Sequence, residues 1–337
     1  MNLGAESERA ARWRGTTVLV TGAGGFIGSA LTNRLASLGA RTRAFVRYNS
    51  AGSWGWLDRL PIKHEIDVRA GDIRDPDTLK AACQDVDTVF HLAALIAIPY
   101  SYTSPLSYIR TNVEGTLNVL QAAHDAGVRL VVHTSTSEVY GSARYVPIDE
   151  EHPLRGQSPY SASKIAADKV AESFHLSFGR PIVTVRPFNT FGPRQSARAV
   201  IPSIITQALT ESVLRLGSLT PTRDFNYVED TVDGFIRAAE VPAAIGEVIN
   251  LGSGIETSVA DVARLVLELI GKQIPIVSEP ERVRPEASEV VRLCASADKA
   301  ARLLGWTPQY GLRGGLAETI RWVEQNLEHY RTGIYAT

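Results

Sequence analysis

The sequence contains little cysteine, no excess charge of either sign and no long apolar run, and each shortage excludes a class of protein. Only two cysteines, Cys83 and Cys294, occur in 337 residues, and they share no short motif that would make a ligand set of their own. We therefore expect reduced thiols, no metal site and a cytoplasmic location. The 35 basic and 36 acidic residues give a formal net charge of −1, so neither nucleic acid nor an anionic membrane is an expected partner.

Signals for membrane insertion and for export are also missing. The most apolar later run, ARLVLELIG, is far shorter than the ~20 residues that cross a bilayer. Residues 1–14, MNLGAESERAARWR, are polar and charged and lack the apolar core of a signal peptide. We predict that this segment is a loose or weakly helical N-terminal tail.

Residues 15–190 instead show a regular alternation of apolar strands and amphipathic helices. This rhythm indicates βαβ units and an α/β fold, a Rossmann-type doubly wound parallel sheet. The predicted strands are 16–22, 41–47, 64–73, 87–94, 128–136 and 181–187, and the predicted helices are 26–40, 75–85, 104–127 and 158–178.

After about residue 190 the alternation becomes irregular, with frequent proline and glycine. A return strand near 246–252 and a helix at 258–271 are the clearest elements there. We predict that 191–337 forms mainly a smaller, discontinuous C-terminal lobe that binds the substrate. Ligands of open α/β sheets bind beyond the carboxyl ends of the strands, so the expected site is a cleft between the lobes.

A glycine-rich loop, VTGAGGFIG, joins the first strand to the first helix. Gly22, Gly25 and Gly28 permit a tight turn and a close approach of the backbone to a pyrophosphate, and Phe26 and Ile27 begin the helix. The N-terminus of that helix offers free N–H groups to the phosphate. The alternative is a plain strand-to-helix turn, but the context favours dinucleotide binding.

The ends of the second and third strands bear on the choice of dinucleotide. An NAD site usually has Asp or Glu at the end of the second strand, whereas AFVRYNS carries Arg47. An arginine there meets the 2′-phosphate of NADP, stacks on adenine or points to solvent. Asp72, in GDI after the third strand, either accepts a hydrogen bond from adenine or caps a helix.

The fifth strand ends in an unusual run, VVHTSTSEVYG, with hydroxyl side chains followed by Glu138. Such residues do not extend a buried sheet, so this is either a capped turn or the floor of an active site. About twenty residues later, YSASK places Tyr160 and Lys164 four apart, on one face of a helix. A nearby ammonium lowers the pKa of a tyrosine, which makes Tyr160 a candidate general base.

These motifs together resemble the extended short-chain dehydrogenase/reductase family, in its nucleotide-sugar epimerase/dehydratase group. The matching segments are TGAGGFIG, GDIRD, VFHLAA, NVEGTLNVLQAA, TSTSEVYG, YSASK, RPFNTFGPRQ and RDFNYVED, and they cover nearly the whole chain after the tail. Three further segments, LIAIPYSY, GQSPYSASKIAADK and GPRQSARAVIPSIITQAL, look most similar to 4,6-dehydratases of the legionaminic-acid type, which act on nucleotide-linked N-acetylhexosamines.

The resemblance implies a role for each residue of the centre. Tyr160 would take the proton of the sugar 4-hydroxyl, Lys164 would hold the cofactor ribose, and Thr136 would bond the 4-oxygen. Glu138 would remove the C5 proton so that the 6-hydroxyl leaves as water. Ser137 departs from the Thr-Asp-Glu triplet of many dTDP-glucose dehydratases, but Thr-Ser-Glu also occurs in GDP-mannose dehydratases and in UDP-glucuronate decarboxylases.

The resemblance also implies the ligands and the residues that bind them. The cofactor would be NAD, with NADP left open by Arg47, and the substrate a nucleotide sugar whose diphosphate is met by arginines. The further cofactor residues are Ile73, Leu92, Ala93, Ala94, Asn112, Pro187 and Phe188. The substrate residues are Asn189, Arg198, Val200, Arg223 and Arg284, with Arg194 and Arg282 as further candidates.

Three functions remain open from the sequence. The first is a 4,6-dehydratase. The second is a C4 epimerase, in which Glu138 is incidental, or a related decarboxylase, which uses the same ketone to release a C6 carboxylate. The third is a catalytically silent dinucleotide-binding regulator, against which the intact Tyr–Lys–Thr set argues. The helices at 104–127 and 158–178 carry apolar residues on more than one side, which predicts a homodimer.

Overall fold

A computed structural model describes residues 3–282 and 285–330 of the chain. In these ranges the centre is a seven-stranded sheet, all of whose strand pairs are parallel, in the order β10-β6-β5-β4-β1-β2-β3. This order is the doubly wound arrangement predicted from the sequence. The strands are β1 Thr17–Thr21, β2 Arg41–Arg47, β3 Asp67–Gly71, β4 Thr88–His91, β5 Leu130–Thr134, β6 Ile182–Pro187 and β10 Val248–Leu251.

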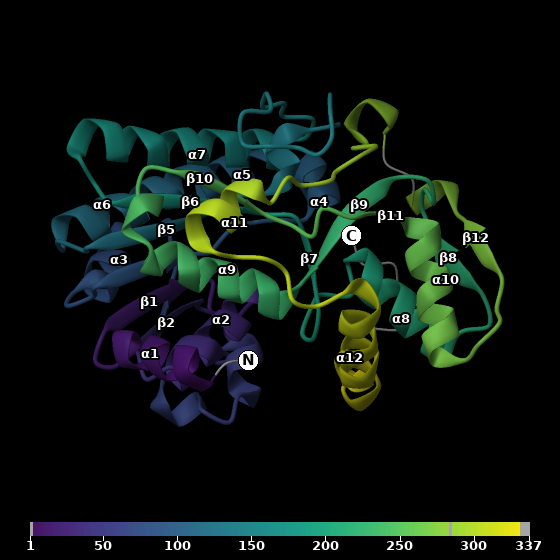
Figure 1. Cartoon of the computed structure of the whole chain (residues 1–337), viewed down its shortest axis with the longest axis horizontal. Coiled ribbons are helices and arrows are strands. Elements are labelled where there is room, and N and C mark those ends of the chain that lie inside the picture. The colour runs from purple at the N-terminus through teal and green to yellow at the C-terminus, as the bar shows by residue number, and fades with distance from the viewer. Residues whose placement is uncertain (1–2, 283–284, 331–337) are drawn as a thin grey trace.

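Helices cover both faces of this sheet, which explains why its strands are apolar on both sides (Figure 1). One face packs on the cluster that contains Leu79, Leu120 and Phe174, and the other on the cluster that contains Leu31 and Phe235. The first face carries α3 Pro76–Cys83, α5 Pro105–Tyr108, the π-helix η3 Ile109–Glu114, α6 Gly115–Asp125 and α7 Pro159–Phe178; the second carries α2 Phe26–Ser37 and α9 Val228–Glu240.

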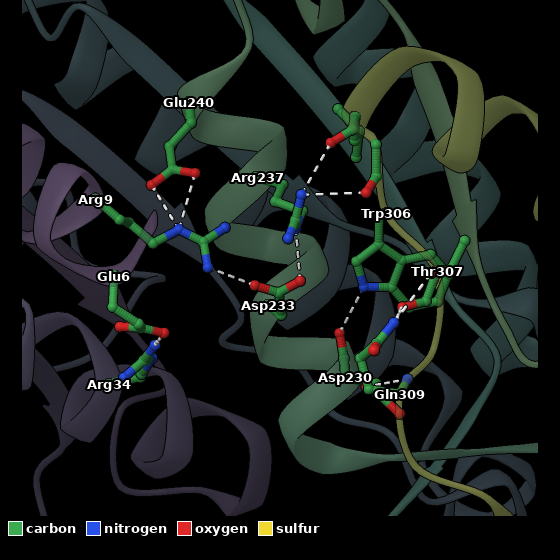
Figure 2. Close-up of polar contacts among 12 residues, drawn as sticks. Glu6, Arg9, Arg34, Asp230, Asp233, Arg237, Glu240, Trp306, Thr307 and Gln309 are labelled. Atoms are coloured by element: carbon green, nitrogen blue, oxygen red, sulfur yellow. Dashed lines mark hydrogen bonds and ion pairs between the residues drawn. The ribbon is translucent and has the colours of Figure 1, made fainter. Parts of the chain in front are cut away.

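Of the two predicted states of the N-terminal segment, loose or weakly helical, the structure has the helix. Leu3–Trp13 forms helix α1, which lies along α9, as Figure 2 shows. Arg9 bonds both Glu240, at 3.0 Å, and Asp233. The indole of Trp13 is 4% exposed and donates to Glu240 at 2.8 Å. These partners lie more than 220 positions away in sequence, so a local reading of the segment does not reveal them.

The C-terminal lobe lies to the right in Figure 1, and its described part is built from short strands and the helices α8, α10 and α12. Its described strands form a three-stranded sheet, β11-β9-β7, and a β12-β8 pair. The elements are β7 Asn189–Phe191, α8 Val200–Thr210, β8 Leu214–Leu216, β9 Thr222–Tyr227, β11 Glu256–Ser258, α10 Val259–Ile270, β12 Ile276–Ser278 and α12 Leu312–Gln325. A further helix of this part of the sequence, α11 Asp298–Leu304, packs on the large domain instead.

The boundary between the lobes is less simple than the predicted division at residue 190. Besides the expected return strand β10, helices α9 and α11 come back to the large sheet. Figure 2 shows how α9 holds the later chain: Trp306 donates its indole N–H to the Asp230 carbonyl at 2.9 Å, and Arg237 bonds the carbonyls of Leu304 and Gly305. The large domain is thus completed by segments from the last third of the sequence.

Short helices fill the connections. They are η1 Gly55–Arg59, η2 Lys63–Glu65, α4 Ile98–Thr103, η4 Ser137–Tyr140, η5 Pro242–Ala244, η6 Pro280–Arg282, η7 Glu286–Ser288 and η8 Leu327–His329. None of the helices within 3–282 and 285–330 is both long enough and apolar enough to span a bilayer.

Candidate active site

The glycine loop has the geometry that a bound diphosphate requires. Gly22 has a φ of +70°, and a Cβ at this position would lie 2.8 Å from the backbone nitrogen of Ala93. A Cβ at Gly28 would collide with the Gly22 carbonyl. Gly25 is the N-cap of α2 and supplies no side-chain cap, so the first N–H groups of the helix stay available. Phe26 begins the helix, as predicted.

The loop after β4 is held against the end of β1. Thr21 Oγ1 accepts hydrogen bonds from the backbone N–H groups of Leu92 and Ala93, both at 3.1 Å. Asn112 is buried, and its amide bonds the backbone of Leu95 twice, at 2.8 and 2.9 Å, and Ser163 at 2.9 Å. Asn112, predicted as a cofactor ligand, therefore uses its side chain to tie this loop to α7.

The ends of β2 and β3 bring Arg47 and Asp72 close together. Arg47 is exposed opposite Gly71 in the register, and its charge helps to lower the pKa of Asp72, although the hydrogen bond from Arg74 lowers it most. The cap of α3 is Asp75, so the alternative that Asp72 caps a helix is wrong. An open groove of about 520 Å³ runs beside this point, lined by Asp72, Arg74, Asp75, Arg110 and Glu114.

The hydroxyl run after β5 is a turn whose cap is Thr136. Its Oγ1 accepts the backbone N–H of Glu138 at 3.2 Å, which begins the short helix η4. Glu138 itself caps nothing in this turn, and its side chain lies near enough to Tyr160 to act on that phenol electrostatically. Ser137 is buried, 3% exposed. Beyond the carboxyl end of β5, Thr136 and Glu138 are therefore partly accessible, whereas Ser137 is not.

Tyr160 and Lys164 occupy the first turns of α7, which a capping box between Ser158 and Ser161 fixes in place. Burial raises the pKa of Tyr160, and a hydrogen bond with Thr136 offsets this only in part. Burial also lowers the pKa of the Lys164 ammonium to about 8. The expected lowering of the Tyr160 pKa by Lys164 is not found, because burial dominates the shift; Lys164 Nζ itself donates to the Thr134 carbonyl at 2.6 Å.

A buried network of charged and polar side chains around Asp168 lies next to Lys164, and it was not predicted from the sequence. Asp168 accepts hydrogen bonds from Ser135 at 2.8 Å and from Arg186 at 3.0 Å, and it contacts His133 Nε2 at 3.2 Å. Burial alone would raise the pKa of Asp168, but His133 and Arg186 lower it to about 2. One signal was available: Asp168 is one helical turn after Lys164, on the same buried face.

Tyr108 is a second residue of the centre that the sequence reading missed. Its ring is fully buried, 6.2 Å from that of Tyr160 in an edge-to-face arrangement, and its hydroxyl donates to the Ala97 carbonyl. Arg198, predicted for the substrate, is exposed but lies close enough to lower the pKa of Tyr108 partly against the effect of burial. Arg198 therefore lies near Tyr108, whose ring packs on that of Tyr160.

The other predicted ligand residues fall into three groups. Asn189 begins β7, and its buried Oδ1 has no hydrogen-bond partner within the described ranges, as expected of a group that awaits a ligand. Phe188, after Pro187, is 2% exposed and packs against Tyr140 in a core cluster, so its side chain is structural. Ile73 packs on Gly115, and Ile27, Ala94 and Val200 are half-buried.

The candidate arginines of the C-terminal lobe do not form one cluster. Arg223, on β9, is buried and pairs with Glu289 at 3.1 Å, whereas Arg282 pairs with Glu279 at 2.8 Å. Arg194 has a φ of +73°, and burial lowers its pKa. Arg284 lies outside the described residues. Arg223 and Arg282 thus each have an acidic partner within the lobe, whereas Arg198 is exposed.

Fold and site together define an extended short-chain dehydrogenase/reductase: a glycine loop on a doubly wound sheet, a Tyr–Lys pair on α7 and a Thr-x-Glu turn after β5. The chain belongs to the GDP-mannose 4,6 dehydratase family, whose sequence model matches residues 19–319. Its relatives include nucleotide-sugar dehydratases and epimerases.

Three similar proteins illustrate this range. UDP-glucose 4-epimerase of Mycolicibacterium smegmatis is 33% identical over 308 residues, which cover 90% of this chain and 96% of that protein. Epimerase Mth375 of Methanothermobacter thermautotrophicus has a TM-score of 0.90, with 35% identity over 99% of both chains. DesIV, the dTDP-glucose 4,6-dehydratase of Streptomyces venezuelae, was solved with NAD bound and has a TM-score of 0.85, with 31% identity over 94% of this chain and 99% of that chain.

Proposed function

We propose that this chain is an NAD-dependent nucleotide-sugar 4,6-dehydratase. The observation that carries the proposal is the position of Glu138: this carboxylate lies close enough to Tyr160, which bonds Thr136, to act on it electrostatically, and it does not cap its own turn. Oxidation at C4 needs only Tyr160, Lys164 and Thr136. A carboxylate beside them gives the additional base that elimination requires.

The residues present fit a dinucleotide. Gly22, Gly25 and Gly28 leave room for the diphosphate, which the N-terminus of α2 attracts. The negative charge of Asp72, beside Arg47, would repel the 2′-phosphate of NADP, which supports NAD. DesIV was also solved with NAD bound. Bound NAD⁺ would supply the hydride acceptor and a positive charge beside Tyr160.

The chain's own residues then act in a fixed order. Tyr160 removes the proton of the sugar 4-hydroxyl, while Thr136 donates a hydrogen bond to the 4-oxygen. The 4-ketone makes the C5 proton acidic, and Glu138 removes it. The C6–oxygen bond breaks, and the 6-hydroxyl leaves as water with the proton that Glu138 has taken from C5. The hydride taken from C4 would return to C6, and C5 would regain a proton in place of the one that Tyr160 removed, so no net reduced cofactor would form.

A C4 epimerase is the second candidate, because the structure with a TM-score of 0.90 is an epimerase. In that function the same Tyr160, Lys164 and Thr136 would promote oxidation at C4. The 4-keto sugar would then rotate in the site, so that the hydride returns to its opposite face. A decarboxylase would use the same ketone to release a C6 carboxylate. Both alternatives make Glu138 dispensable as the base at C5.

We propose further that the sugar is a nucleotide-linked N-acetylhexosamine, on the resemblance of LIAIPYSY and GQSPYSASKIAADK to dehydratases of the legionaminic-acid type. Asn189, Arg198, Val200, Arg223 and Arg284 are the proposed substrate residues. Two buried free cysteines support a reducing, cytoplasmic location. Exposed Leu106, Ile109 and Leu117 on α5, η3 and α6 support a homodimer.

The test is a panel of nucleotide sugars, with the products identified by NMR in D₂O, for the wild type and two variants. For a dehydratase, Glu138→Gln should lose turnover by roughly 10²–10⁴-fold, the usual contribution of a positioned acid–base group. It should still oxidise C4 and so accumulate reduced cofactor with the 6-hydroxyl attached. Tyr160→Phe should block both steps. Near wild-type turnover of Glu138→Gln, with inversion at C4, would instead establish the epimerase.

A further inference from the structure

The segment that follows β2 lies against the glycine loop through its backbone. Trp56 donates its backbone N–H to the Gly24 carbonyl at 3.0 Å. Gly55 has a φ of +68°, and a Cβ at this position would collide with the same carbonyl. The close approach therefore requires glycine at this position. Gly24 lies between two of the glycines that shape the diphosphate loop, so whatever holds Trp56 also holds that loop.

The indole of Trp56 is anchored on the other lobe. It meets Trp322 of α12 edge to face, with ring centroids 5.2 Å apart and planes at 74°, and it meets the ring of His329 at 5.9 Å. Arg59, at the end of η1, lies 3.4 Å from the same histidine. Trp56 is thus bonded to the cofactor loop by its backbone and packed on the C-terminal lobe by its side chain.

The contacts continue from Trp322 toward the substrate side. The ring of Tyr330 lies 6.2 Å from that of Trp322, and its hydroxyl donates to the Gln195 carbonyl at 3.0 Å. The Gln195 amide in turn donates to the carbonyl of Thr190, the residue after Asn189 on β7, at 2.8 Å. An unbroken set of packed rings and hydrogen bonds therefore joins the glycine loop to the strand that carries a substrate candidate.

We propose that Trp56 is a positioning residue for the dinucleotide: anchored on α12, it fixes the glycine loop, so that the affinity for NAD depends on the C-terminal lobe. This inference rests on the proposed NAD-dependent function. Its physical reason is that a glycine-rich loop has much backbone freedom to lose when it closes on a phosphate. A carbonyl already bonded to an anchored residue reduces that loss, and a preorganised site binds more tightly.

The test is a double-mutant cycle on the full chain, stripped of bound nucleotide and titrated with NAD by calorimetry. Trp56→Ala and Trp322→Ala should each weaken NAD binding by about 3- to 10-fold, the range that one aromatic pair supports. The double variant should be no weaker than the worse single variant, because both changes remove one interaction. Trp56→Phe should restore most of the affinity. Trp54→Ala is the matched control, since its indole is 38% exposed in the same segment.

The outcomes separate this inference from the proposed function. If the wild type binds NAD and Trp322→Ala binds it equally well, or if the two effects add, the inference is overturned and the proposed function stands. If the wild type binds no NAD, the proposed function and the inference both fail. Thermal unfolding without nucleotide identifies a variant that is merely unfolded. In that case the NAD affinities of Trp56→Phe and Trp322→Phe, which keep a ring in place, are compared with that of the wild type instead.

Discussion

Lys164 shows how one buried side chain links packing to chemistry. Its ammonium is 4% exposed and bonded to a main-chain carbonyl, and burial lowers its pKa to about 8 although the charge of Asp168 acts in the opposite direction. At a pH near 8, Lys164 therefore begins to lose the positive charge that its proposed role requires. Tyr160, one turn earlier, has a raised pKa for the same reason, burial.

We expect the activity to fall as the pH rises through about 8. Below this pH Lys164 is cationic and above it neutral, so kcat/KM should decline by about tenfold per pH unit on the alkaline side. The measurement is kcat/KM between pH 6 and 10. Lys164→Arg, which stays charged, should keep a low activity without this decline. A wild-type profile that stays flat to pH 10 would contradict the assignment.

At the scale of elements, the sequence predicts the helices and strands that are stabilised by interactions between residues close together in the chain. The strand expected at 41–47 is β2 with the same bounds, and the expected helix 158–178 is α7 within one residue, because alternating apolar residues and a serine–proline cap mark them. The packing of helix α1 on α9 and the Asp168 network were missed. The contacts that stabilise them join residues far apart in sequence, such as Arg9 with Asp233, and a short polar segment has no pattern that names such a partner.

The same reasoning applies to the site. The glycine loop, Thr136, Glu138, Tyr160 and Lys164 were predicted because each lies in a compact motif. Asn112 and Phe188 were assigned to the cofactor, yet their side chains bond or pack within the chain. A motif shows that a position is constrained, and only the fold shows whether a ligand or the protein's own backbone is responsible.

Helix α1 is predicted to contribute substantially to stability. Trp13→Ala should lower the free energy of unfolding by about 3 kcal/mol, since it removes a buried indole that packs 6.1 Å from Phe90 of β4 and bonds Glu240. Urea denaturation followed by circular dichroism measures this difference. Glu8→Ala, an exposed change on the same helix, should stay within about 0.5 kcal/mol. Equal stabilities for both variants would show that α1 is dispensable.

At the scale of the whole molecule, one surface is more apolar than a monomer needs. Helices α6 and α7 lie side by side on one face of the sheet (Figure 1), and Leu106, Ile109 and Leu117 are 42–58% exposed on the first helical stretch. Leu176 and Phe178 are exposed near the end of α7. A second copy related by a two-fold axis would cover such a face with the same face of its own.

We expect dimers at micromolar concentration and monomers after this face is charged. Ile109→Glu combined with Leu117→Glu should halve the mass measured by light scattering, because a buried carboxylate pair strongly opposes association. Ile255→Glu is the control, since Ile255 is 65% exposed at a turn of the other lobe. A monomeric wild type, or a double variant that stays dimeric, would place the interface elsewhere or remove it.

The buried pair of Asp168 and Arg186 has a consequence for how this sequence can evolve. Either charge left alone in the interior would cost about 3–5 kcal/mol, a large share of the stability of a typical domain. A lineage therefore cannot lose one member by a single neutral substitution. Both positions must change together, or through an intermediate in which His133 or Tyr140 has already been replaced. We therefore expect Asp168 of helix α7 and Arg186 of strand β6 to be retained or replaced together.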